Sequence, residues 1–187
     1  CKLFDISQAH FVLDPDKNAP CRLIAHEFQQ GDFKDYQSVL DFGKDKNVLT
    51  IEIEHVNTDA LKQLESDGVK VFPQPHILEL IKDKGLQKQF YKENNIPTAP
   101  FVLVNSKAEL NEYVQDFPFM QKARTGGYDG KGVHALISES DIDNGFDAPS
   151  VLEKFVDFEK ELSVIVARNE SGEVVTYPIV ELEFNPV

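Results

Sequence analysis

The chain has 187 residues, of which 41% are hydrophobic and 27% are charged, an ordinary globular composition. Its 32 acidic residues outnumber 19 Lys and Arg residues, which gives a formal net charge of −13. A charge of this sign repels phosphate backbones, so no nucleic acid partner is expected, and a small anionic substrate requires a local cluster of cations. No apolar run approaches the roughly 20 residues that span a bilayer, so no membrane partner is expected either.

The two cysteines indicate the cellular compartment of the protein, and the two ends of the chain indicate whether it is a fragment. Cys1 and Cys21 form no CxxC or metal pattern, which favours a reducing compartment such as the cytoplasm. The N-terminus lacks the long apolar core and the cleavage site of a signal peptide. The chain begins at Cys1 without a methionine and stops at Val187 just after a strand-like run. We therefore expect a fragment of a longer protein.

The first half of the chain alternates strand patterns with helix patterns. Strands are predicted at 11–14, 27–29, 47–54 and 69–72, and helices at 33–46, 58–66 and 76–95, the last as two helices meeting near Asp83. Gly68 follows the helix at 58–66 at the position of a C-terminal cap. Such alternation favours a parallel sheet with helices on both faces.

The pattern changes at 96–104, where two prolines mark a linker. A helix is predicted at 106–117, with Ser106 and Glu109 as a capping box. Strands then follow at 117–123, 133–137, 150–156, 161–169 and 173–184, with a hairpin turn at 169–172. The second half is therefore predicted to be an antiparallel sheet with one or two helices.

Residues 122–133 read "KARTGGYDGKGV", with glycines at 126, 127, 130 and 132. A Walker A loop does not fit, because the glycine spacing is one residue short and Gly132 replaces the required Ser or Thr. A dinucleotide fingerprint must open a helix, whereas this loop leads into a strand. A plain hairpin turn remains an alternative. The favoured interpretation is a flap between strands, whose backbone N–H groups approach phosphate oxygens while Lys122 supplies positive charge.

Two other segments carry candidate ligand-binding residues. Residues 153–156 are predicted to end a strand in a linker whose backbone pairs with an adenine edge, and Glu161 would accept hydrogen bonds from ribose hydroxyls. A solvated strand edge is the alternative for both. Glu52 and Glu54 alternate with isoleucines, and we expect them near the C-terminal end of their strand, where parallel sheets bind ligands. The five histidines show no metal-binding spacing, so no metal ligand is predicted among them.

Several stretches resemble, in order and at similar spacing, the N5-carboxyaminoimidazole ribonucleotide synthetase family. They are "VLDPDKNAP", "LTIEIEHV", "IKDKGLQKQFYKENNIPTAPF", "RTGGYDGKGV", "LEKFVDFEKELSVIVAR" and "YPIVE", which together extend over nearly the whole chain. The family comprises ATP-grasp enzymes of purine biosynthesis, the ATPase subunits of phosphoribosylaminoimidazole carboxylase. The combination is much more specific than a lone glycine motif.

The resemblance implies an α/β fold with a defined domain order. Residues 1–97 would form a pre-ATP-grasp domain with a parallel sheet that lacks its first strand. Residues 98–180 would form the small α+β lid domain, and residues 181–187 would begin the truncated large ATP-grasp domain. In the family, ATP and bicarbonate form carboxyphosphate, and its carboxyl group passes to the amine of 5-aminoimidazole ribonucleotide. The enzyme would be a carbon–nitrogen ligase that requires Mg²⁺, with metal ligands beyond residue 187.

The resemblance also implies roles for individual residues. Tyr128, Lys131 and Glu54 would be catalytic and face the ribonucleotide and bicarbonate. ATP would be bound by Lys84, Lys122, Gly127, Tyr128, Asp129, Gly130, Lys131, Gly132, Val133, Glu153, Lys154, Phe155, Val156 and Glu161. The family often has Gln at the position of Val133.

The sequence departs from the family pattern at three further positions. Lys84 stands where the family usually has Arg, which keeps the charge but loses the bidentate fork. Leu182 and Phe184 replace an Asn and a His, which makes that edge of the pocket more apolar. The family is dimeric, so a homodimer is expected at full length, and the fragment alone is expected to be inactive. Alternatives are another ATP-grasp ligase, such as the formate-dependent glycinamide ribonucleotide transformylase, and a non-catalytic nucleotide-binding module.

Overall fold

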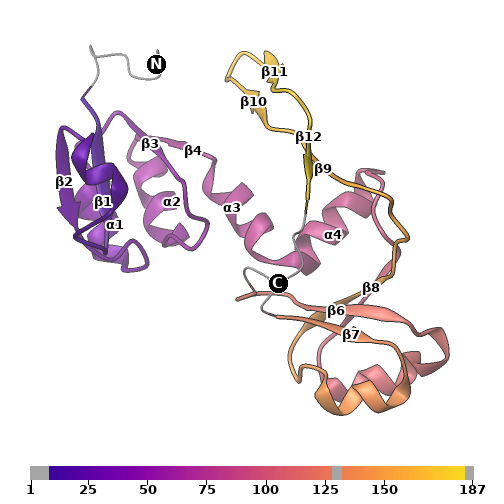
Figure 1. The fold of residues 1–187 in the computed structure, drawn as a ribbon. Helices are drawn as coiled ribbons and strands as arrows, with labels where there is room; N and C mark the ends of the chain where they lie inside the picture. The colour runs from indigo at the N-terminus through magenta and orange to yellow at the C-terminus, as the bar shows by residue number, and fades with distance from the viewer. Residues whose placement is uncertain (1–8, 128–131, 184–187) are drawn as a thin grey trace.

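The structure is a computed structural model that describes residues 9–127 and 132–183. Its N-terminal elements are β1 (Phe11–Asp14), the 3-10 helix η1 (Pro20–Leu23), β2 (Glu27–Gln30), α1 (Tyr36–Gly43), β3 (Val48–Thr50), α2 (Thr58–Ser66) and β4 (Lys70–Phe72). β1 pairs with β2 and β3 pairs with β4, in both cases in parallel. The predicted parallel pairing and both helices are confirmed, but the four strands form two separate two-stranded sheets and not one. Figure 1 shows this part in indigo and purple.

The strand predicted at 47–54 is shorter than expected. β3 ends at Thr50, and residues 51–54 form a bend and a turn. The backbone N–H of Ile51 still donates to the carbonyl oxygen of Phe72 at 3.0 Å. The partner strand ends at Phe72, and Gln74, the next residue whose N–H could face β3, is already the N-cap of α3, so the ladder stops there. Glu52 and Glu54 consequently lie in the turn after the strand and not within it.

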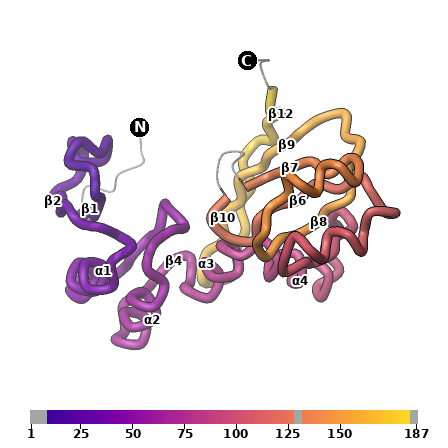
Figure 2. The backbone as a smooth tube through the Cα atoms, turned by 90° about the horizontal axis from the view of Figure 1, so that it is seen from below, coloured from indigo at the N-terminus to yellow at the C-terminus, as the bar shows by residue number. Residues whose placement is uncertain are grey.

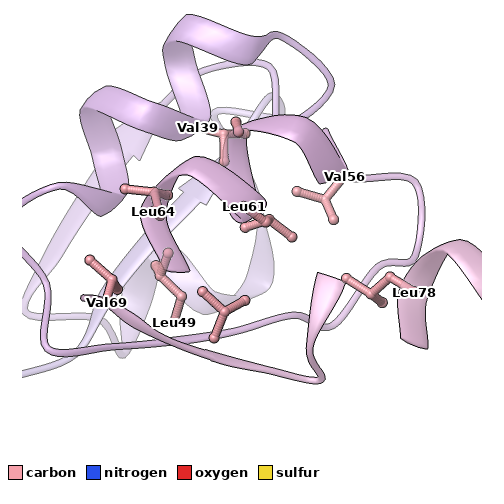
Figure 3. Close-up of a cluster of buried hydrophobic side chains, with 9 residues drawn as sticks. Val39, Leu49, Val56, Leu61, Leu64, Val69 and Leu78 are labelled. Carbon is pink, nitrogen blue, oxygen red and sulfur yellow. The ribbon is translucent and has the colours of Figure 1, made fainter. Parts of the chain in front are cut away.

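The core of the N-terminal part is built on α2. Asn57 caps this helix by accepting the N–H of Ala60 at 3.0 Å, and Gly68 follows its end with a φ of 94°, which a glycine adopts without strain. Leu61 and Leu64 lie on the inner face of the helix and are almost fully buried. Figure 3 shows around them Val39 of α1, Leu49 of β3 and Leu78 of α3, with Val56 and Val69 from the segments before α2 and β4. Ala60 and Val71 complete the cluster.

Two consecutive helices join the N-terminal part to the C-terminal sheet, as Figures 1 and 2 show. They are α3 (Pro75–Lys82) and α4 (Lys84–Glu93), and they meet at Asp83 as predicted. Asp83 has an extended backbone that ends α3, and its carboxylate accepts the N–H groups of Gly85 at 2.7 Å and Leu86 at 3.2 Å. One residue therefore terminates one helix and caps the next.

The C-terminal part contains a four-stranded antiparallel sheet in the order β5-β8-β6-β7. Its elements are β5 (Phe101–Val104), η2 (Lys107–Asp116), β6 (Phe119–Ala123), β7 (Val133–Leu136), η3 (Glu139–Asn144) and β8 (Ser150–Lys154). A second core lies between the sheet and the two 3-10 helices: Val104, Leu110, Phe119, Leu136, Ile142 and Leu152. The predicted antiparallel sheet is confirmed.

The helix predicted at 106–117 is a 3-10 helix, and its capping box is wrong. Ser106 makes no capping hydrogen bond, and the Glu109 carboxylate accepts the N–H of Asn105 at 3.0 Å instead. A complete capping box occurs at η3, between Ser138 and Asp141.

The last strands form a two-stranded ribbon, drawn in yellow in Figure 1. β9 (Glu161–Ser163) pairs with β12 (Val180–Leu182), and β10 (Val166–Arg168) pairs with β11 (Val174–Thr176), all antiparallel. The strand predicted at 161–169 is therefore broken. Two residues, 164–165, lie opposite three, 177–179, and the central one of the three is proline, so a bulge interrupts the ladder. The side chains of this ribbon are exposed throughout.

Candidate functional site

The end of β6 places Lys122 beside a second strand that carries a buried acid. Lys122 lies opposite Val151 in the β6–β8 register, and Glu153 lies opposite Met120. The ammonium nitrogen of Lys122 donates to Oε2 of Glu153 at 2.9 Å. Glu153 is only 9% exposed, and a buried carboxylate requires a counter-ion.

A second lysine reaches the same carboxylate from α4, which packs beside β8. Nζ of Lys88 lies 3.3 Å from Oε1 of Glu153 and donates to the hydroxyl of Thr98 at 2.5 Å. Lys88 is itself 9% exposed, and its ammonium group lies 6.0 Å from the centre of the Phe101 ring. The two ammonium groups thus take one carboxylate oxygen each and leave one net positive charge at this end of the sheet.

The neck of the glycine loop is fixed to the start of α4. Arg124 binds Asp83 in a bidentate manner, with Nε at 2.8 Å from Oδ1 and Nη2 at 2.6 Å from Oδ2. The backbone N–H of Lys84 donates to the carbonyl oxygen of Arg124 at 2.9 Å. A Cβ on Gly85 would lie 2.5 Å from Nε of Arg124, so glycine is needed there for the guanidinium to reach Asp83. We call this pair of residues and its backbone bond the Asp83–Arg124 clamp.

The clamp shifts the pKa values of both its members. Burial raises the pKa of Asp83, but hydrogen bonds from Arg124 and from the N–H groups of Leu86 and Gly85 outweigh it, so the net pKa is lowered. The hydrogen bond to Asp83 raises the pKa of Arg124. Both groups are therefore held in their charged forms.

At both ends of the glycine loop, a glycine adopts a backbone conformation that favours glycine. Gly126 and Gly132 have φ values of 75° and 76°, in the left-handed region that favours glycine. The N–H of Ala123 donates to the carbonyl oxygen of Gly132 at 2.9 Å, which closes the neck of the loop, and a Cβ on Gly132 would lie 3.1 Å from Cα of Gly127. Val133 opens β7. The other predicted loop residues, Tyr128, Asp129, Gly130 and Lys131, lie outside the described residues.

An open cleft of about 1190 Å³ separates the N-terminal part from the start of the loop. Its lining comes from the segment before α1, the turn after β3, the start of α2, the end of α3 and the neck of the loop: Lys34, Glu52, Ile53, Glu54, His55, Val56, Asn57, Thr58, Asp59, Lys82, Thr125 and Gly126. Glu54 thus lies in the same cleft as the neck of the predicted phosphate loop, 72 positions further along the chain at Gly126 (126 − 54 = 72).

Lys82 lines this cleft, and a hydrogen bond fixes its ammonium group. Its ammonium nitrogen donates to the carbonyl oxygen of Val56 at 2.6 Å. Burial lowers the pKa of Lys82, and the nearby acids Glu79, Asp59 and Glu54 oppose this shift only in part. The cleft therefore combines acids and lysines, which suits a polar substrate.

The predicted adenine linker begins where β8 ends. Lys154 is the last residue of β8 and donates to the backbone carbonyl of Asp116, while Phe155 and Val156 are exposed at 45% and 55%. Glu161 is exposed at the start of β9 and makes no described hydrogen bond to Lys122 or Glu153. The structure thus brings Lys122 and Glu153 together and bonds the backbone of Lys84 to that of Arg124, but it does not join Glu161 to them.

Sequence reasoning missed Lys88, Arg124 and Asp83 as parts of this site. One signal for Lys88 was available, because it follows Lys84 by four residues and therefore lies on the same face of a helix. The Asp83–Arg124 clamp joins residues 41 positions apart, and no local pattern links them.

Within residues 9–127 and 132–183, no three His, Cys, Asp or Glu side chains group in a way that could hold a metal ion. Within the same ranges, no helix is long and apolar enough to cross a membrane.

The neck of a glycine loop between antiparallel strands, a lysine beside it and a cleft that contains both acids and lysines lie on one α/β scaffold. The ATP-grasp domain family matches residues 89–184, just over half of the chain, and the ribonucleotide synthetase preATP-grasp domain family matches residues 3–82. The chain belongs to the ATP-grasp family, and the predicted fold class is confirmed.

Two proteins of that family are similar to this chain over most of its length. Phosphoribosylaminoimidazole carboxylase of Ogataea methanolica is 38% identical over 180 residues, which cover 91% of this chain and 33% of the relative. N5-carboxyaminoimidazole ribonucleotide synthetase of Thermotoga maritima is 40% identical with a TM-score of 0.81, over 91% of this chain and 46% of that one.

A third similar structure contains ligands. The N5-carboxyaminoimidazole synthase of Aspergillus clavatus, in complex with ADP and 5-aminoimidazole ribonucleotide, is 33% identical with a TM-score of 0.82. The match covers 94% of this chain and 48% of that one. The chain therefore spans between a third and a half of the length of these relatives.

Proposed function

We propose that this chain supplies the ATP-binding lid and one wall of the substrate cleft of an enzyme that carboxylates 5-aminoimidazole ribonucleotide. The observation that carries the proposal is that the neck of the glycine loop, which follows Lys122 in the chain and is bonded through Arg124 to the backbone of Lys84, lines the cleft that contains Glu54. Relatives that span the same two domains are named for this activity. The same names favour the aminoimidazole substrate over the glycinamide one.

The proposed reaction has two steps. A bicarbonate oxygen attacks the γ-phosphorus of ATP, ADP leaves, and carboxyphosphate forms. The exocyclic amine of the ribonucleotide then attacks the carboxyl carbon, inorganic phosphate leaves, and the amine loses a proton. Because phosphoryl transfer is catalysed mainly by positioning and charge neutralisation, lysines at the phosphates are the contribution expected of this part of the chain.

In this proposal each domain has a separate task. Residues 1–97 line the cleft for the ribonucleotide and bicarbonate, with Glu54 facing them. Residues 98–180 hold ATP, with Lys122 on the phosphates, residues 153–156 on adenine, Glu161 on ribose and the loop 127–133 over the phosphates. Residues 181–187 begin the large ATP-grasp domain. Tyr128 and Lys131 would contact the ribonucleotide when the loop closes.

Mg²⁺, a homodimer and a cytoplasmic location also belong to the proposal. Mg²⁺ neutralises the triphosphate in reactions of this class. The described residues do not group into a metal site, so no step is assigned to a metal held by them.

The test is phosphate release by the full-length protein encoded by the reading frame that contains this chain. ATP and bicarbonate are supplied with and without 5-aminoimidazole ribonucleotide. Release stimulated by the ribonucleotide is expected, and the absence of stimulation would refute the assignment. Glycinamide ribonucleotide with formate serves as the control for the alternative ligase.

A further inference from the structure

The shared carboxylate of Glu153 sets a condition on how Lys122 can bind a phosphate. Lys122 donates to one oxygen of Glu153 at 2.9 Å, and Lys88 lies 3.3 Å from the other. In the proposed function Lys122 must turn its ammonium group toward the phosphates of ATP. If Lys122 were the sole counter-ion of Glu153, this movement would leave a charge that is only 9% exposed without a partner, which is costly.

The two lysines differ in how firmly they are held. The side chain of Lys122 is 31% exposed, whereas that of Lys88 is 11% exposed. Lys88 is also bound to the Thr98 hydroxyl and lies near the face of Phe101. No described contact other than Glu153 holds the ammonium group of Lys122. One lysine is therefore fixed in the interior, and the other stands at the edge where a ligand arrives.

We propose that Lys88 is a positioning residue that keeps the Glu153 carboxylate neutralised and so allows Lys122 to exchange Glu153 for an ATP phosphate. Lys88 touches no ligand in this role and acts through Glu153. The inference rests on the proposed function, because it requires Lys122 to bind phosphate. The rival explanation is that Lys88 only braces α4 against β8, in which case its charge has no particular effect on phosphate binding.

The experiment measures the dissociation constants of ATP and of adenosine by titration calorimetry on the full-length protein. Lys88→Met keeps the length of the buried stem and removes the charge. Lys92→Met is the matched control, four residues further along the same helix and exposed. We expect Lys88→Met to weaken ATP binding about tenfold or more, the scale of one charged hydrogen bond, and to leave adenosine binding within about twofold. Lys92→Met should bind both as the wild type does.

A double variant separates the two explanations. In Lys88→Met combined with Glu153→Gln, the neutral amide needs no counter-ion and holds Lys122 weakly. We expect this double variant to bind ATP as tightly as Glu153→Gln alone, because Lys88 then has no charge left to neutralise. A merely structural role for Lys88 predicts that the double variant binds ATP more weakly than Glu153→Gln alone, because the second substitution restores no contact of Lys88. If Lys88→Met does not fold, the comparison of the double variant with Glu153→Gln decides alone.

Three results would overturn the inference. They are ATP binding by Lys88→Met that matches the Lys92→Met control, an equal loss of ATP and adenosine affinity, and a double variant that binds ATP more weakly than Glu153→Gln alone. Failure of the wild type to bind ATP would instead overturn the proposed function, and the inference with it.

Discussion

The Asp83–Arg124 clamp should be a measurable source of stability, and its size can be worked out from its burial. The side chains of Arg124 and Asp83 are 24% and 19% exposed. Exposed ion pairs contribute about 0–1 kcal/mol, whereas removing one partner of a fully buried pair costs about 3–5 kcal/mol. A bidentate pair between these limits should contribute about 2 kcal/mol to the free energy of unfolding.

The variants must separate the ion pair from the helix cap, because Asp83 serves both. Asp83→Asn keeps a side-chain oxygen for the N–H groups of Gly85 and Leu86 but removes the charge. Arg124→Met keeps the length of the side chain and removes the guanidinium. In a double-mutant cycle of these two substitutions, we expect a coupling energy of about 1–2 kcal/mol at pH 7. Urea unfolding followed by circular dichroism is the assay.

The pH dependence of the clamp follows from the lowered pKa of Asp83. A carboxyl group whose folded pKa lies below its ordinary value of 3.8 stabilises the fold in full above that value. The contribution is lost as the pH falls through the folded pKa. The stability difference between the wild type and Arg124→Met should therefore be constant near pH 7 and shrink below about pH 4.

The exposed Lys62–Glu79 pair provides the control for this reasoning. Its side chains are 46% and 40% exposed, so the same cycle there should give less than about 1 kcal/mol. A coupling energy at Asp83–Arg124 no larger than that of the control pair would refute the estimate. A difference that persists unchanged in acid would refute the assignment of the effect to the Asp83 charge.

Three other substitutions have expected outcomes. Leu64→Ala empties a fully buried position of the α2 core and should cost about 2–5 kcal/mol in urea unfolding, whereas a cost below about 1 kcal/mol would mean that the cluster is not packed there. Gly132→Ala places a Cβ 3.1 Å from Gly127 Cα at a φ of 76°, so we expect a loss of about 1–2 kcal/mol, checked by thermal melting. Lys122→Ala should weaken ATP binding about tenfold or more with an unchanged circular dichroism spectrum, and wild-type affinity would contradict the role of Lys122.

Local patterns in the sequence predicted most of the fold. The helix α2 begins and ends where the sequence places it, because Asn57, the apolar spacing and Gly68 all act within a few residues. The break at Asp83 is predicted for the same reason. The predictions fail where the partner strand decides the outcome. The β3–β4 ladder ends early because the chain after Phe72 turns into α3, and the strand predicted at 161–169 is broken where residues 164–165 lie opposite residues 177–179.

In the candidate site, too, the residues that are contiguous in the chain could be predicted, and those brought together by packing could not. The glycine loop and Lys122 could be found from composition and spacing, since they are contiguous in the chain. Lys88, Glu153 and Arg124 come together only because α4 packs beside β8 and its N-terminus contacts the end of β6. Residues 41 positions apart, as in the Asp83–Arg124 clamp, carry no mutual signal in a single sequence.

The exposed ribbon β9–β12 has a consequence for handling the chain in solution. Each outer edge of a two-stranded ribbon presents unpaired backbone groups, and apolar side chains such as Val166, Val174 and Ile179 are more than half exposed here. Such edges favour intermolecular strand pairing and aggregation. The net charge of −13 opposes this, because chains of like charge repel one another. Salt screens that repulsion over about 10 Å at 0.1 M, so dilute, low-salt buffer should keep the chain dispersed, and added salt should promote its aggregation.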